Sequence, residues 1–69
     1  MSKVEIIVKV DDANTSKISE IARQCEAAGM SIDQQMSAVG MITGSIEKAK
    51  MSSLEQIKGV SYVEESRAI

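Results

Sequence analysis

The sequence predicts a small α+β domain whose elements follow the order strand, helix, strand, strand, helix, strand (βαββαβ). Three observations lead to this prediction: strict alternation of apolar and polar residues at the start of the chain, an apolar stripe at helical spacing after it, and short apolar segments that begin after glycines. A chain of 69 residues is long enough for one domain only, which we expect to span residues 1–69.

The first strand is predicted over residues 3–10. One face carries only β-branched apolar residues, namely Val4, Ile6, Val8 and Val10. The other face carries Lys3, Glu5, Ile7 and Lys9. An alternation of period two is typical of a half-buried strand, and it leaves Ile7 as an apolar residue among charges.

The first helix follows a turn over residues 11–14, in which Asn14 is placed to cap it. Its apolar stripe recurs every three or four residues: Ile18, Ile21, Ala22, Cys25 and Ala28. This spacing places one apolar face along about three helical turns. Gly29 then ends the helix, because glycine readily adopts the left-handed conformation of a helix C-terminus.

Two strands are predicted next, over residues 30–37 and residues 41–46, with a turn between them. Ile32 and Met36 among polar residues indicate the earlier strand. Gly44 lies inside the later one, which indicates a bulge or a close approach of another backbone segment.

The second helix is predicted over residues 47–58, with a weaker stripe formed by Met51, Leu54 and Ile57. A capping box at Ser52–Glu55 favours a late start for its regular part. Gly59 closes this helix and leads into a last strand over residues 60–65.

The last strand is predicted to bury Val60 and Val63 and to present three side chains to a partner: Tyr62, Glu64 and Glu65. The last four residues form a tail: Ser66, Arg67, Ala68 and Ile69. For the two glutamates, solvated charges that protect a sheet edge are the other interpretation.

Elements in this order assemble into a ferredoxin-like two-layer sandwich, in which a four-stranded antiparallel sheet carries two helices on one face. Right-handed crossovers place the first and third strands in the centre. Ile7, Met41 and Tyr62 should then lie near one another on the bare face. We interpret them as a partner-binding patch around a tyrosine anchor. Ordinary exposure of scattered apolar residues is the other interpretation.

Composition argues against several classes of function. The net charge of −2 and the single aromatic residue speak against binding of nucleic acid. The absence of histidine and the presence of only one cysteine predict no metal site, no cofactor and no nucleophilic catalysis. A Schiff-base enzyme needs a desolvated lysine, but the lysines considered lie in polar surroundings: Lys9, Lys48, Lys50 and Lys58. We therefore predict that the chain is not an enzyme.

The chain has no apolar run near the roughly 20 residues of a membrane span, and its start lacks the apolar core of a signal peptide. A single cysteine suits a reducing compartment. We therefore expect a soluble cytoplasmic protein, monomeric or weakly dimeric, without a membrane partner.

Residues 4–9, residues 26–32 and, most specifically, the ending Gly59-Val60-Ser61-Tyr62-Val63-Glu64-Glu65 are similar to segments of a known family. They resemble the prodomains of subtilisin-like serine proteases and the proteinase inhibitors related to them. The resemblance implies a βαββαβ domain that assists folding of the protease and then inhibits it. Because no protease domain follows Ile69 in the sequence, we expect the domain to act in trans.

The resemblance also implies how the partner is bound. The open sheet face packs against two surface helices of the protease, acidic side chains meet the N-termini of those helices, and the C-terminal tail lies in the substrate cleft. Glu64 and Glu65 match the acidic positions, and Ser66 to Ile69 match the tail, which is shorter than that of a prodomain. A carboxylate at a helix N-terminus meets unsatisfied N–H groups and the positive end of the helix dipole.

Residues 28–32 are also similar to the helix-to-strand turn of ACT-type regulatory domains, which share this fold, dimerise and bind amino acids near their first loop. The corresponding loop here is Asp11–Asn14, which lacks the glycine that those domains usually carry. A dimer that senses a small ligand is therefore the alternative to a domain that binds a protease.

Overall fold

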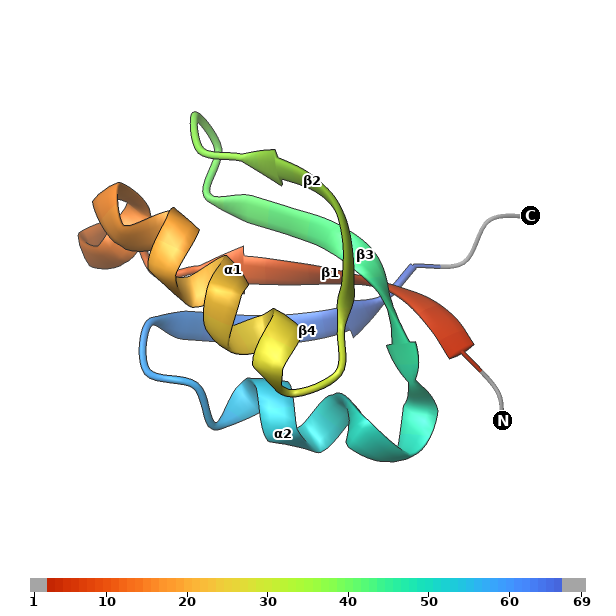
Figure 1. Cartoon of the computed structure of the whole chain (residues 1–69). Coiled ribbons are helices and arrows are strands. Elements are labelled where there is room, and N and C mark those ends of the chain that lie inside the picture. The colour runs from red at the N-terminus through yellow and green to blue at the C-terminus, as the bar shows by residue number, and fades with distance from the viewer. Residues whose placement is uncertain (1–2, 67–69) are drawn as a thin grey trace.

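A computed structural model describes residues 3–66 and shows a four-stranded antiparallel sheet with both helices on one of its faces (Figure 1). The strands are β1 (Lys3–Val10), β2 (Ser31–Met36), β3 (Met41–Glu47) and β4 (Val60–Glu65). The α-helices are α1 (Ile18–Ala27) and α2 (Met51–Glu55), preceded by the 3₁₀ turns η1 (Asp12–Lys17) and η2 (Lys48–Lys50). The predicted fold class is confirmed.

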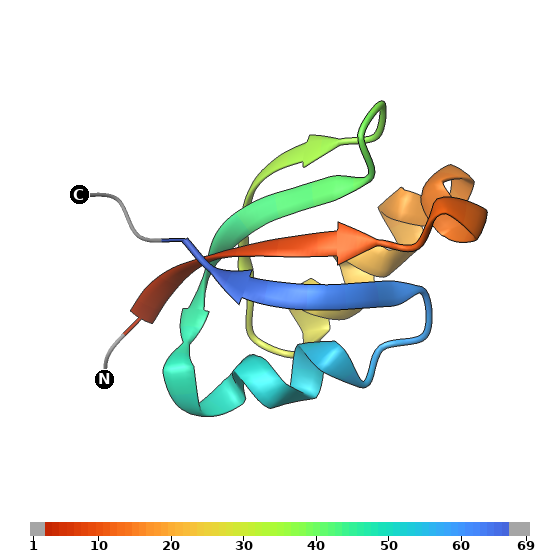
Figure 2. The same ribbon diagram turned by 180° about the vertical axis from the view of Figure 1, so that it is seen from behind.

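The strands lie in the order β2-β3-β1-β4, so the first and third strands are central, as predicted. The view from behind shows the four strands with α1 beyond them and α2 running below β4, along that edge of the sheet (Figure 2). Both helices contribute to the core on one side of the sheet, and no element of residues 3–66 covers the other side.

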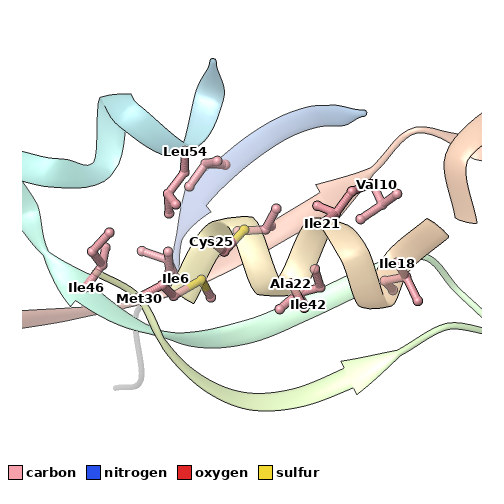
Figure 3. Close-up of a cluster of buried hydrophobic side chains, with 12 residues drawn as sticks. Ile6, Val10, Ile18, Ile21, Ala22, Cys25, Met30, Ile42, Ile46 and Leu54 are labelled. Atoms are coloured by element: carbon pink, nitrogen blue, oxygen red, sulfur yellow. The ribbon is translucent and has the colours of Figure 1, made fainter. Parts of the chain in front are cut away.

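The core lies between the sheet and the helices, where apolar side chains from both layers meet (Figure 3). The strand side of the core consists of Ile6, Val8, Val10, Ile42, Ile46 and Val63. Ile18, Ile21, Ala22, Cys25, Met30 and Leu54 close it from the other side. Each fully buried aliphatic side chain of this size contributes about 1.5–3 kcal/mol relative to an exposed one. The alternation of β1 and the stripe of α1 thus have the roles that their spacing predicted.

A bulge in β4 allows both valines of that strand to face the core. Lys9 pairs with Tyr62, whereas Val10 pairs with Val60, so that Ser61 has no partner on β1. In a regular strand, residues three positions apart point to opposite faces. Because Ser61 is an extra residue, Val60 and Val63 point to the same face. Val63 is buried there, and Val60 is partly buried against the core.

A second bulge, in β2, turns the two apolar residues of that strand, Ile32 and Met36, to opposite faces of the sheet. Ile32 pairs with Gly44 and Gln34 with Thr43, which leaves Asp33 as the extra residue. Ile32 packs against the core, but Met36, beyond the bulge, points to the opposite face. Opposite this bulge the two backbones approach closely, because a Cβ added at Gly44 would collide with the carbonyl oxygen of Ser31. The close approach predicted at this glycine is confirmed.

The predicted cap of the first helix and the predicted length of the second are wrong. Asn14 does not cap α1, because it lies inside the 3₁₀ turn; Lys17 occupies the capping position without a side-chain bond. The helix predicted over residues 47–58 is much shorter, since Glu47 still belongs to β3 and α2 spans five residues only. Leu54 is the one buried residue of α2, so little apolar surface stabilises a longer helix.

The capping box at Ser52–Glu55 is not used either. The expected late start of the regular helix is confirmed, since the α-helix begins only at Met51, but its N-cap is Lys50, two residues before Ser52, and Lys50 makes no side-chain hydrogen bond. The 3₁₀ turn η2 connects β3 directly to this short helix, so the chain enters it already in a helical conformation.

Candidate protein-binding face

The side of the sheet that faces away from the helices, called the open face below, is built from two rows of side chains. One row, called the apolar row below, crosses all four strands, because each of its residues pairs with the next one. It consists of Met36, Met41, Lys9 and Tyr62. The adjacent row consists of Gln34, Thr43, Ile7 and Glu64. Directly opposed residues on antiparallel strands have their Cβ atoms about 4.5–5.5 Å apart, so the members of each row are in contact range of their neighbours.

The structure brings Ile7, Met41 and Tyr62 together on the open face, as the sequence led us to expect. Tyr62 is the most accessible of them, with 46% of its surface exposed, while Ile7 and Met41 are half-buried. Sequence reasoning missed Met36, which lies next to Met41. Nothing in the sequence indicates the bulge at Asp33 that turns Met36 to this side.

Lys9 contributes its aliphatic stem to the apolar row and directs its charged ammonium group to one end of it. Its Nζ donates a hydrogen bond of 2.7 Å to the carbonyl oxygen of Val39, in the turn between β2 and β3. Val39 itself is 51% exposed and lies three residues after Met36 in that turn. The ammonium group is thus held at one end of the face, and the stem of Lys9 lies beside Met41.

The two glutamates of β4 lie on opposite faces of the sheet. Glu64 opposes Ile7 and therefore belongs to the open face. Glu65 opposes the buried Ile6, so it lies on the helix side, where its Oε1 is 3.9 Å from Nζ of Lys48. The open face carries Glu64 without Glu65.

Ser66 continues the pairing of β4 with β1 beyond the last strand residue. Its backbone N–H donates a hydrogen bond of 2.7 Å to the carbonyl oxygen of Glu5. The chain therefore leaves the sheet beside the first half of β1. The remaining predicted tail residues, Arg67, Ala68 and Ile69, lie outside the described residues.

A hollow of about 420 Å³ lies at this end of the sheet. Its lining comes from β1, β2, β3 and the start of the tail: Glu5, Ile6, Ile7, Ser31, Ile32, Asp33, Thr43, Gly44, Ser45 and Ser66. Small side chains at Ser31, Gly44 and Ser45 leave this space empty.

Residues 3–66 contain no group of three potential metal ligands, no buried polar or charged side chain, and no helix with the length and apolarity of a membrane span. Burial raises the pKa of the Cys25 thiol to about 11, which keeps it protonated and unreactive at neutral pH. On the open face, the accessible features are the apolar row and the polar hollow beside it.

Comparison of the chain with models of protein families and with curated proteins finds no match to either.

Proposed function

We propose that the chain is a non-enzymatic protein-binding domain that uses the open face of its sheet, and that its partner is a subtilisin-like serine protease. The domain would inhibit the protease or assist its folding, acting in trans. The observation that carries the proposal is the uncovered row of Met36, Met41 and Tyr62 beside Ile7.

The apolar row has the composition of an interface centre. Tyrosine and methionine are enriched at protein interfaces, and a partly exposed tyrosine among aliphatic side chains is a typical energetic anchor. The row spans the full width of the sheet, so the helices of a partner have a continuous surface to pack on.

The polar groups around the row support the same docking mode. Glu64 borders Ile7 and leaves its carboxylate accessible, as a group that meets the N-terminus of a partner helix requires. Glu65, on the other side of the sheet, takes no part in this contact. The pairing of Ser66 with Glu5 starts the tail at the edge of the open face, from which the last residues would continue toward the substrate cleft.

The test is an inhibition assay with purified subtilisin. Progress curves with a chromogenic peptide substrate should slow at micromolar concentration of the wild-type chain. Replacement of the anchor by Tyr62→Ala should weaken inhibition by at least about tenfold, as for an interface residue worth more than about 1.4 kcal/mol.

The matched control is Gln24→Ala, on the exposed outer surface of α1, which should inhibit like the wild type. Circular dichroism spectra of both variants verify that they are folded. Progress curves that remain unchanged at excess wild-type protein would remove the protease from the proposal. Equal inhibition by Tyr62→Ala and wild type would remove the open face as the contact surface.

A further inference from the structure

The hollow beside Ser66 differs from the rest of the open face in being concave and polar. It forms where the bulge at Asp33 bends β2, and where Ser31, Gly44 and Ser45 contribute little or no side-chain volume. Its volume of about 420 Å³ is within the range of sites that enclose a small ligand or a long side chain.

The charges of the hollow have one sign. Its charged lining residues are Glu5 and Asp33, and four hydroxyl groups add further acceptors: Ser31, Thr43, Ser45 and Ser66. No lysine or arginine of residues 3–66 lines it. Two lysines flank the hollow along β1 on this face. Lys3 lies two residues before Glu5 and is exposed outside the lining, whereas Lys9 has its ammonium group bound to Val39 at the other end of the sheet.

We infer that the hollow receives an arginine side chain of the protein that docks on the open face, an inference that rests on the proposed protein-binding function. A guanidinium group offers five N–H donors in a plane, which suits two carboxylates surrounded by hydroxyl oxygens. Ile7 forms part of the lining and also belongs to the rows of the open face, so an arginine at this place continues the apolar contact. The partner therefore combines apolar residues over Met41 and Tyr62 with a basic residue at one end.

The test uses a small probe and does not need the partner. N-acetyl-arginine methylamide is titrated into the ¹⁵N-labelled chain, with N-acetyl-citrulline methylamide as a neutral probe of the same shape. We expect saturable shifts of the amide signals of Ser31, Thr43 and Ser45 with the arginine probe only, weakened by added salt.

Charge variants then locate the site. Glu5→Gln combined with Asp33→Asn should weaken binding of the probe by at least about tenfold, since both negative charges are lost and the remaining amide oxygens accept only weaker, neutral hydrogen bonds. Glu20→Gln, on the exposed surface of α1, should leave it unchanged. Both carboxylates of the hollow are solvent-exposed, so the variants should remain folded.

The titration is repeated with Arg67→Gln, because Arg67 follows Ser66 in the sequence and carries the same group as the probe. Absence of saturable shifts in both proteins, equal binding of the citrulline probe, or unchanged affinity in the Glu5/Asp33 variant would overturn the inference. If the protease is not inhibited but the arginine probe binds, the protease is refuted as partner and the arginine site stands. If the protease is inhibited but the probe does not bind, the arginine site is refuted and the protease stands.

Discussion

Replacing Gly44 by alanine should destabilise the protein, although the same change in a strand with ordinary backbone angles is usually neutral or stabilising. Alanine restricts the unfolded chain and stabilises by about 0.4–1 kcal/mol where the backbone tolerates it. Gly44 is not among the glycines with a positive φ, so its backbone conformation alone does not forbid a side chain. The obstacle is the neighbouring strand.

The structure shows what the added methyl group would meet. It would collide with the carbonyl oxygen of Ser31 and come within 3.0 Å of Cε of Met30. Met30 can change its rotamer, but Ser31 cannot move without displacing β2. Overpacking of this kind costs about 1–3 kcal/mol, which exceeds the gain from the unfolded state and leaves a net loss of about 1–2 kcal/mol.

That loss is large for a chain of 69 residues, whose total stability is roughly 3–10 kcal/mol at 0.05–0.15 kcal/mol per residue. The melting temperature should fall by roughly 5–15 °C, at about 4–8 °C per kcal/mol for a domain of this size. Urea denaturation followed by far-UV circular dichroism measures the free energy of unfolding, and amide hydrogen exchange should be accelerated in β2 more than in β1.

The control is Ser45→Ala, the next residue of β3, whose side chain points to the open face and which should change stability by less than about 0.5 kcal/mol. If Gly44→Ala is as stable as the wild type or more stable, the carbonyl group of Ser31 does not approach β3 as described, and the account of the β2 bulge fails.

Four further predictions concern the core, the charges and the oligomeric state. Burial raises the pKa of the Cys25 thiol from 9.0 to about 11. The stabilisation by the protonated thiol is therefore fully present below pH 9 and is lost as the pH rises towards 11. Over that pH window, the difference between the urea-unfolding free energies of wild type and Cys25→Ala should narrow. Leu54→Ala should cost about 2–5 kcal/mol in the same measurement, and Ile57→Ala, at a partly buried position, clearly less; equal costs would contradict the role of Leu54 as the anchor of α2. Lys48→Met should change stability by less than about 1 kcal/mol, because its contact with Glu65 is long and solvent-exposed; a larger loss, absent in Glu65→Gln, would show that Lys48 has another role. Size-exclusion chromatography at several concentrations should show a monomer or a weak dimer that amino acids do not affect, whereas a ligand-dependent dimer with a thermal shift would favour the ACT-type alternative.

Local sequence patterns predicted the elements whose side chains have one clear periodicity. The alternation of β1 and the stripe of α1 each divide a segment into an apolar and a polar side, and burying the apolar side is the dominant favourable term in folding. The order βαββαβ and the handedness of its crossovers then restrict the topology to the observed one. For the same reason, the sequence alone predicts that Ile7, Met41 and Tyr62 lie on the open face.

The tertiary structure alone decided the features that depend on contacts between distant segments. The bulge at Ser61 lets both Val60 and Val63 face the core, whereas the bulge at Asp33 turns Met36 away from the core side that Ile32 occupies. No local signal specifies either extra residue. One of them adds Met36 to the open face and opens the hollow beside Glu5. The lengths of the 3₁₀ turns and of α2 were likewise set by packing, since capping signals worth about 1 kcal/mol are weaker than the burial of one side chain such as Leu54. Local chemistry thus selected the elements, and long-range packing positioned the side chains that a partner would meet.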